Sequence, residues 1–388
     1  MTDLKIEFDS PNNVYFPGQE VTGRVILKGK DPIKASFLKI CIRGEAHTGW
    51  YQTDLIPYLN VENEKEYDHQ QVKYSGRVVY LSDETIAWRA TDGNDRIPSG
   101  TNIFQFSFEL PTECSPSLEG SHGHIRYSVH VELDRPWKFN KKTKKLFSVV
   151  PTYDLNVIPD AINPMINTNS VKTGLIFKKG QISVTANLPK RGFVPGEIVP
   201  ITLHIDNGSG NRVSKIYSNL LQLTHFHASF SPLDPDSPTR YHHRDDEKCV
   251  AEARTTVNIP AKTEGKVVLS LKVPSVVPSF HCSIIDVEYC IIVRVHQDSM
   301  FGGGNLKVEF PLIVGTVPVR STVPAVPTVP VPLAAGYPPP SYEESMSIGK
   351  PEDSEPFAPR YPVYNDLPPY SPSKSSYEEE EEGKAVKM

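Results

Sequence analysis

The sequence predicts an all-β protein with two tandem antiparallel β-sandwich lobes, followed by a disordered proline-rich tail. Three observations lead to this prediction: short apolar runs that alternate with polar residues, blocks of sequence that recur within the first 315 residues, and an abrupt rise in proline content after them. Few segments show the 3.6-residue period of an amphipathic helix. We therefore expect domains over residues 1–160 and 175–315, and a tail over 316–388.

The alternation is clearest in Phe104–Leu110, where large apolar side chains occupy every second position. Residues i, i+2 and i+4 of a strand share one face, so this segment is typical of a strand with one buried face. Similar reasoning predicts strands over Val21–Leu27, Phe37–Ile42, Arg77–Leu81, Phe104–Leu110, Ile125–Leu133, Leu155–Ile158, Ile182–Asn187, Val199–Ile205, Ser218–Thr224, Val267–Val273, Val287–Val295 and Leu306–Val314. Glycine, proline, asparagine and aspartate between these runs favour sandwiches.

An internal duplication determines the number of lobes. The block Phe16-Pro17-Gly18-Gln19-Glu20-Val21 recurs 178 positions later as Val194-Pro195-Gly196-Glu197-Ile198-Val199, and 125–129 recurs at 287–291. In each Pro-Gly pair proline presets φ and glycine tolerates positive φ, so both pairs are predicted turns that lead into a strand. The smaller second offset indicates an insertion in the first copy, within Trp50–Gln71. Two unrelated sandwiches that share only turn chemistry are the alternative.

The tail differs in composition from everything before it. After Gly315 there are 15 prolines in 73 residues, against 21 in the preceding 315, and an acidic run occupies Glu378–Glu382. Such a segment buries too little apolar surface to offset the entropy of the chain, so we expect it to be disordered. Repeated Val-Pro steps from Val317 to Pro332 favour a stiff polyproline II spacer.

The tail carries a PPxY motif, Pro339-Pro340-Ser341-Tyr342. In polyproline II the two prolines fit between aromatic rings of a WW domain, and the tyrosine fills a neighbouring pocket. Leu367-Pro368-Pro369-Tyr370 is a weaker LPxY copy, and two sites on one tail would raise avidity for a partner with several WW domains. The predicted WW-binding residues are Pro339, Pro340, Tyr342, Leu367, Pro368 and Tyr370. The alternative is that a proline-rich tail contains such patterns by chance.

Two further surface features predict partners. A basic cluster lies between the strand ending at Leu133 and the next one, and it would bind acidic or phosphorylated cargo tails or anionic lipid. Its residues are Arg135, Lys138, Lys141, Lys142, Lys144 and Lys145. A solvated turn is the simpler interpretation of that cluster. Tyr364-Asn365-Asp366-Leu367 matches a tyrosine-based sorting signal for clathrin adaptors, although the pattern is short.

Composition and motifs exclude several functions. The formal net charge of −5 gives no positive field that would attract nucleic acid. The most apolar stretch, Val314–Tyr337, contains five prolines and Arg320, so it predicts no membrane span. The first residues lack a secretory signal, which predicts a cytosolic chain. No nucleophile elbow, phosphate-binding loop, HExxH or dinucleotide-binding glycine motif is present, so we expect neither an enzyme nor a cofactor.

Cysteines and histidines give only weak indications of a site. Five cysteines without CxxC spacing predict reduced thiols rather than a disulfide framework, namely Cys41, Cys114, Cys249, Cys282 and Cys290. His225 and His227 share a face of one strand, with His242-His243 on a possible partner strand, but no cysteine or carboxylate completes a zinc ligand set. His122 and His124 form no zinc ligand set in the sequence either. We therefore expect no metal.

Taken together, several blocks resemble the α-arrestins, the arrestin domain-containing proteins. They are Tyr15–Gly23, Ile40–Ala46, Ile125–Tyr127 followed by Arg135-Pro136-Trp137, Gly192–Glu197 and Cys282–Tyr289, with the PPxY motif after them. The resemblance implies two arrestin-like sandwich lobes packed end to end. It also implies a cytosolic adaptor that binds cytosolic tails of membrane receptors or transporters and recruits HECT-type ubiquitin ligases through PPxY. Cargo would then be ubiquitinated, internalised and sorted, with the adaptor recruited peripherally to plasma membrane and endosomes.

Two other hypotheses remain open at this point. An arrestin-fold trafficking scaffold would act through its lobes and sorting signals without recruiting a ligase, and it predicts that Tyr342→Ala leaves cargo internalisation unchanged. A redox-regulated binder would use Cys249 or Cys282, and it predicts that Cys→Ser changes weaken partner binding.

Overall fold

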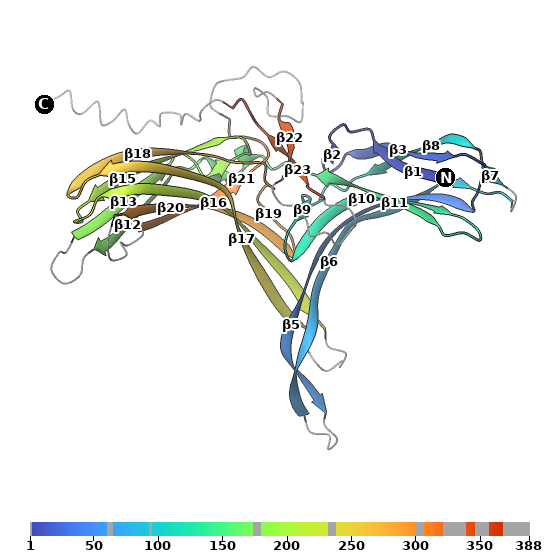
Figure 1. Cartoon of the computed structure of the whole chain (residues 1–388), viewed down its shortest axis with the longest axis horizontal. Helices are drawn as coiled ribbons and strands as arrows, with labels where there is room; N and C mark the ends of the chain where they lie inside the picture. The colour runs from blue at the N-terminus through green and yellow to red at the C-terminus, as the bar shows by residue number, and fades with distance from the viewer. Residues whose placement is uncertain are drawn as a thin grey trace.

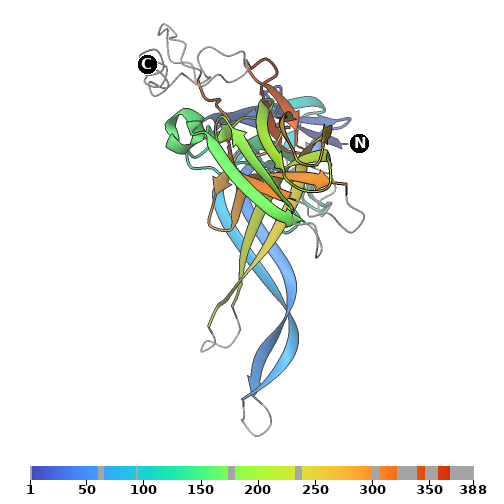
Figure 2. The same ribbon diagram turned by 90° about the vertical axis from the view of Figure 1, so that its left-hand side faces the viewer.

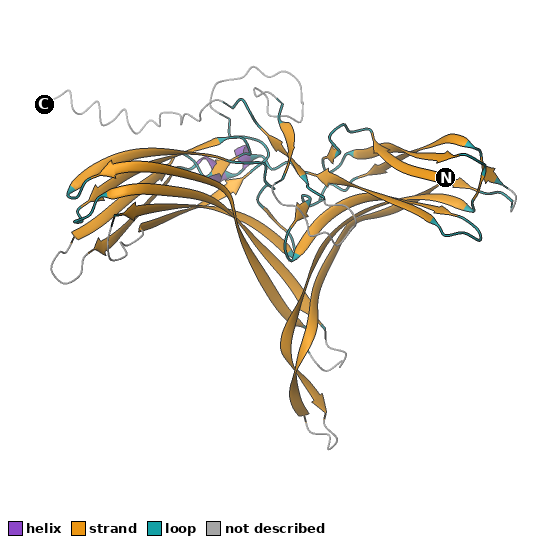
Figure 3. Ribbon diagram, in the orientation of Figure 1, coloured by secondary structure: helices purple, strands orange, loops and turns teal. Residues whose placement is uncertain are grey.

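Nearly every described element of the chain is a strand, and the strands form two curved lobes that share one sheet (Figure 1). The computed structural model describes residues 2–59, 65–92, 95–173, 180–231, 238–298, 306–320, 339–345 and 357–367. Within those ranges, helix occurs only as two short turns between the lobes (Figure 3). None of the helices described there is long and apolar enough to cross a membrane.

The N-terminal lobe is a sandwich of two sheets. The smaller has the order β1–β3–β8, with β1 Thr2–Phe8, β3 Glu20–Gly29 and β8 Gly100–Glu109. The larger has the order β6–β5–β10–β11–β2, with β2 Val14–Tyr15, β5 Phe37–Leu59, β6 Lys65–Arg89, β10 Gly123–Asp134 and β11 Lys141–Val149. Three short strands lie outside this path: β9 Leu118–Glu119 pairs with β10, and β4 Ile33–Lys34 pairs with β7 Arg96–Ile97. Phe106 and Phe108 of β8 face the core between exposed neighbours, which confirms the predicted alternation.

The C-terminal lobe repeats this plan. One sheet has the order β12–β13–β15–β18, with β12 Met165–Thr173, β13 Gly180–Leu188, β15 Ile198–Asn207 and β18 Thr263–Lys272. The other has the order β14–β21–β20–β16–β17, with β14 Gly192–Phe193, β16 Val213–Phe230, β17 Arg240–Ile259, β20 Ile285–Gln297 and β21 Leu306–Val314. The short β19, Phe280–His281, pairs with β20.

The strand boundaries confirm the duplication. Strands β3 and β15 have ten residues each, and both ends of β15 lie 178 positions after those of β3. Strands β8 and β18 alternate between exposed and buried positions in the same pattern. Tyr127 and Tyr289 are both fully buried, and their hydroxyls donate to equivalent carbonyl oxygens, those of Ser115 (2.7 Å) and Val277 (2.6 Å). A buried tyrosine needs such an acceptor, so the duplication preserves the polar contact together with the ring.

Two long hairpins extend away from the lobes and join them (Figure 2). Strands β5 and β6 have 23 and 25 residues, whereas their counterparts β16 and β17 have 18 and 20. The predicted insertion within Trp50–Gln71 is therefore the outer part of the first hairpin. Ser75 of β6 pairs with Ser229 of β16, and this pairing makes one twelve-stranded sheet of the two large sheets.

The segment between the lobes differs from its prediction. Leu155–Ile158 was expected to be a strand, and this expectation was wrong because 3-10 turns η1 (Leu155–Val157) and η2 (Pro159–Ile162) occupy the region. The Asp154 carboxylate accepts a hydrogen bond from the Asn156 N–H at 2.9 Å and caps the first turn. Proline at the start of the second turn has the φ that a helical turn requires.

The tail also departs from the expectation of disorder in its described parts. Residues 339–345 and 357–367 contain two strands, β22 (Ser341–Glu344) and β23 (Arg360–Val363), which pair antiparallel with Tyr342 opposite Pro362. We call this pair of strands the tail hairpin. Its aromatic residues pack on apolar surface of the lobes. The composition of the tail alone does not reveal that surface, so it predicts disorder. The Val-Pro spacer and the acidic run lie largely or wholly outside the described residues.

Candidate functional site: the tail hairpin at the seam between the lobes

The tail hairpin lies over the seam where the two lobes meet (Figure 1). Toward the N-terminal lobe, the Tyr361 hydroxyl donates to the Ser117 carbonyl at 2.6 Å, and the Arg360 N–H donates to the Ser148 hydroxyl at 2.9 Å. Toward the C-terminal lobe, the Ser275 hydroxyl donates to the Glu343 carbonyl at 2.9 Å. One short hairpin therefore contacts both copies of the duplicated fold.

Strand β23 provides most of the buried surface of the hairpin. Tyr361 and Val363 are 1% and 3% exposed, and Tyr361 belongs to the main apolar core of the lobes. Burial, reinforced by the nearby Glu119, raises the pKa of Tyr361 well above its ordinary value. Its hydroxyl thus remains protonated and can donate to Ser117. Strand β22 is the outer strand, where only Tyr342 is partly buried.

The residues after β23 continue the contact along the C-terminal lobe. The Tyr364 N–H donates to the Pro195 carbonyl at 2.9 Å, and its hydroxyl donates to the Thr316 carbonyl at 2.8 Å. Gly196, with φ of +92°, lies directly beneath Tyr364, and a Cβ at this glycine would overlap the Tyr364 carbonyl. The duplicated Pro-Gly turn of the C-terminal lobe therefore acts as a docking surface for the tail.

This docking involves the tyrosine and the leucine of the predicted sorting signal, Tyr364 and Leu367. Tyr364 is 4% exposed and belongs to a second apolar cluster with Leu155, Val194 and Val319, and Leu367 packs against the same cluster. The signal Tyr364-Asn365-Asp366-Leu367 is thus bound to the protein's own surface in this conformation. A clathrin adaptor would have to compete with that surface.

The PPxY motif lies at the start of β22. Pro339 is exposed, Pro340 is half-buried, and the Tyr342 ring packs edge-on against Phe16 with 6.5 Å between ring centroids. Burial raises the pKa of Tyr342. Since a WW domain binds a polyproline II segment with its tyrosine presented, this strand conformation is not the bound form. Of the LPxY copy, Leu367 packs as described above, whereas Pro368 and Tyr370 lie outside the described residues.

The predicted basic cluster is divided between two faces of the β10–β11 hairpin. On one face, Lys141 donates to the Thr2 carbonyl and Lys145 lies 5.0 Å from the centre of the Phe8 ring. Burial lowers the pKa of Lys145. On the other face, Lys142 and Lys144 are exposed, with Lys142 paired to Glu132 at 3.1 Å. Two more members occupy the turn, where Lys138 is exposed and Arg135 is half-buried.

The histidines that approach one another in the sequence pair mainly with carboxylates. His225 Nδ1 lies 2.8 Å from Asp245, and His227 Nε2 lies 3.1 Å from Asp286. His242 stacks on His243 with 5.9 Å between ring centroids. Among the residues that the structure describes, no three histidine, cysteine, aspartate or glutamate side chains are arranged to hold a metal ion.

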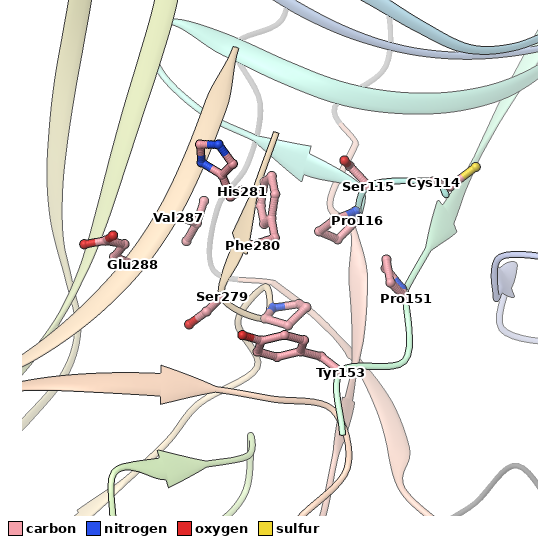
Figure 4. Close-up of a pocket in the computed structure, with 11 residues that line it drawn as sticks. Cys114, Ser115, Pro116, Pro151, Tyr153, Ser279, Phe280, His281, Val287 and Glu288 are labelled. Carbon is pink, nitrogen blue, oxygen red and sulfur yellow. The ribbon is translucent and has the colours of Figure 1, made fainter. Parts of the chain in front are cut away.

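A cleft of about 520 Å³ lies between the lobes (Figure 4). It is lined by 114–116, Pro151 and Tyr153 of the N-terminal half, and by 278–281 and 287–288 of the C-terminal lobe. Burial raises the pKa of the Cys114 thiol, which disfavours the nucleophilic thiolate. His281, opposite it in the cleft, pairs with Asp286 rather than with a nucleophile. All five cysteines of the chain are unpaired, and Cys249 is exposed.

Comparisons with known proteins agree with this architecture. Residues 4–156 match the model of the arrestin (or S-antigen) N-terminal domain, and residues 178–319 match that of the arrestin (or S-antigen) C-terminal domain. The chain is 28% identical over 313 residues to human arrestin domain-containing protein 4, covering 80% of this chain and 70% of that protein. It is 25% identical over 321 residues to arrestin domain-containing protein 17 of Caenorhabditis elegans, covering 82% and 71%.

A third relative is the human thioredoxin-interacting protein, 26% identical over 322 residues, with 81% of this chain and 74% of that protein covered. Arrestins are generally adaptors rather than enzymes, in keeping with the absence of catalytic motifs from the sequence. With both arrestin domains in tandem and relatives that share more than two thirds of their length with it, the chain belongs to the α-arrestin family.

Proposed function

We propose that this α-arrestin is a cytosolic adaptor that recruits WW-domain HECT-type ubiquitin ligases through Pro339, Pro340 and Tyr342. Its lobes would bind the cytosolic tails of membrane receptors or transporters at the plasma membrane and endosomes. Ubiquitination of that cargo would then lead to its endocytosis and sorting. The observation that carries the proposal is the position of the PPxY motif, on a hairpin attached to both arrestin lobes, with Pro339 exposed.

Recruitment by this route requires the tail hairpin to open. Tyr342 packs on Phe16, and its strand pairs with β23, so the ring and backbone must leave these contacts to adopt polyproline II. The apparent affinity for a WW domain is then the affinity of the free motif multiplied by the fraction of open molecules. A short peptide with the same motif should therefore bind more tightly than the full chain does.

Binding of a purified tandem WW protein to the full chain tests the proposal. Tyr342→Ala should abolish most of the binding. Tyr51→Ala serves as a control because it removes a tyrosine ring from an exposed position on the long β5–β6 hairpin, outside the tail. If binding is lost only when Tyr370→Ala is combined with Tyr342→Ala, the LPxY copy also takes part in binding. A peptide over Pro339–Tyr342 that showed no binding would remove ligase recruitment through this motif.

The packing of Tyr342 and Tyr364 also favours one alternative, an arrestin-fold scaffold that acts without a ligase. In that case the hairpin is a permanent part of the seam. Cargo internalisation in cells would be unchanged by Tyr342→Ala, and the wild-type chain would retain no ligase from lysate. Clathrin adaptors would then be reached through other surfaces of the lobes.

A further inference from the structure

The turn between β10 and β11 presents two aromatic side chains to solvent. Trp137 is 99% exposed and Phe139 is 94% exposed, whereas the next most exposed large apolar residue in the described part of the chain, Tyr241, is 82% exposed. Figure 1 shows this turn at the free end of the N-terminal lobe, away from the tail hairpin. Two almost fully exposed aromatic side chains, two residues apart at the end of a lobe, indicate a surface that meets a partner.

Hydrogen bonds between residues of the turn and of the adjoining strand close the turn. The Arg135 guanidinium donates to the Phe139 carbonyl at 3.0 Å, and the Arg135 N–H donates to the Asn140 side chain at 3.2 Å. Asn140 in turn donates to Glu132 at 2.9 Å. Trp137 is held in the left-handed region with φ of +62°, which a large side chain rarely adopts. Since strain is usually retained where it serves a function, these contacts favour deliberate presentation of both rings.

The positive charge around the turn favours an anionic partner. Residues 132–145 contain six basic and two acidic side chains, a net charge of +4 in a chain whose total is −5. Lys138 lies between the two aromatic residues, and Lys142 and Lys144 are exposed on the adjoining strand. Tryptophan favours the headgroup region of a bilayer, and basic residues are attracted to anionic lipid. Exposed aromatic rings on the turn and exposed lysines on the turn and the adjoining strand together have both properties.

We propose that Trp137 and Phe139 insert into the interface of an anionic bilayer, with Lys138, Lys142 and Lys144 against the headgroups. The lipid contact itself does not depend on the proposed function. Only its biological role, which is to hold the adaptor next to membrane cargo, rests on that function. The inference sharpens the predicted role of the basic cluster in two ways. It selects lipid as the partner, and it leaves Lys141 and Lys145 out of the contact because both point to the β1 side of the hairpin.

Vesicle binding by the full chain tests this inference directly. We expect the chain to sediment with vesicles of phosphatidylcholine and phosphatidylserine but not with phosphatidylcholine alone, with an affinity that falls as salt rises. The combined change Trp137→Ser and Phe139→Ser should weaken binding by about tenfold or more, because membrane affinity scales with buried apolar area. Tyr241→Ser is the matched control, since it removes an exposed aromatic side chain from another hairpin.

Tryptophan fluorescence separates insertion from loose association. Of the three tryptophans, Trp50 is 8% exposed and Trp88 is half-buried, so a blue shift of the emission on vesicles reports mainly on Trp137. Trp137→Phe should retain binding and lose the shift. Lys138→Glu with Lys142→Glu should weaken binding most at low salt.

Two results would overturn the inference. One is that the wild-type chain does not bind anionic vesicles at low salt. The other is that the double serine variant binds these vesicles as well as wild type does; if that variant also loses capture of a phosphorylated acidic peptide, the turn is a peptide site. Neither assay contains a ligase or a WW domain, so the inference and the proposed ligase recruitment can fail independently.

Discussion

The two Pro-Gly turns of the duplicated fold are built alike but are covered differently. In each, the glycine N–H donates to the carbonyl of the residue that follows a strand, from Gly18 to Leu110 at 3.0 Å after β8 and from Gly196 to Val273 at 2.7 Å after β18. The side chain after the glycine accepts from the backbone N–H three residues earlier, at 3.1 Å for Gln19 and 3.2 Å for Glu197. The duplication has therefore preserved the internal geometry of the turn.

What surrounds the turns has diverged. Gln19 is exposed, whereas Glu197 is 7% exposed and pairs at 2.5 Å with Lys190, which is 1% exposed. At the N-terminal turn, Asn12 and Gln19 stand at the positions of Lys190 and Glu197. The charged turn is the one that Tyr364 of the tail covers. A turn that becomes an internal docking surface must satisfy its buried polar groups internally, and here an ion pair does so.

The largest effect is expected from breaking that ion pair. Lys190→Met leaves the Glu197 carboxylate buried without its partner, and such a change costs about 3–5 kcal/mol of unfolding free energy. Lys190→Asn combined with Glu197→Gln copies the N-terminal turn, and it should recover most of the loss. Urea unfolding of the full chain measures both. If the double variant were as unstable as Lys190→Met, the unpaired charge would not be the cause.

A smaller, pH-dependent effect should distinguish the lobes at another duplicated position. Burial, together with the positive charge of Arg126, lowers the pKa of His124 to about 4, and the C-terminal lobe has Asp286 at this position. In the unfolded chain the His124 imidazole takes up its proton near pH 6.5. Between pH 6.5 and 4 the unfolded chain therefore binds more protons than the folded chain, and the unfolding free energy falls as the pH is lowered. The loss should approach about 3 kcal/mol at pH 4.

His124→Gln removes this titration and keeps a polar side chain. Urea unfolding of wild type and variant at pH 7 and pH 5 isolates the contribution, because the other eleven histidines are common to both chains. The difference in unfolding free energy between the two chains should change with pH. A constant difference would show that His124 is not held neutral by burial.

The sequence predicts the lobes better than the seam, and the reason is physical. Strands such as β8 bury one face within a single sandwich, so alternation in the chain is sufficient to find them. Among the described strands, β17 (Arg240–Ile259) pairs with β16 alone and is mostly polar, so it carries little alternation of apolar residues. It was predicted only as a possible partner strand around His242-His243. The tail hairpin depends on a surface made by two lobes together. The alternating Tyr361 and Val363 were the available signal, and the prolines around them obscured it.

The candidate site shows the same division. The PPxY motif and the basic cluster are visible as short patterns, but neither the packing of Tyr342 on Phe16 nor the exposure of Trp137 follows from them. Both depend on which residues of distant segments come together. The sequence thus identifies the candidate binding motifs, and tertiary packing determines which of their side chains are accessible to a partner.

The smallest effect, and the most direct test of the comparison, comes from placing alanine in each turn. Both glycines have positive φ, so Gly18→Ala and Gly196→Ala should each lose about 1 kcal/mol of unfolding free energy. Only at Gly196 would the methyl group also overlap the Tyr364 carbonyl, since a Cβ at Gly18 meets the Thr112 methyl at an ordinary 3.5 Å. Gly196→Ala should therefore release the tail hairpin and raise WW-domain affinity by about three- to tenfold, while Gly18→Ala leaves it unchanged. Calorimetric titration of both variants with one WW domain measures this, with the free PPxY peptide as the upper limit. Equal affinities for the two variants would mean that the turn of the C-terminal lobe does not control access to the motif, and the different covering of the two turns would then have no consequence for recruitment.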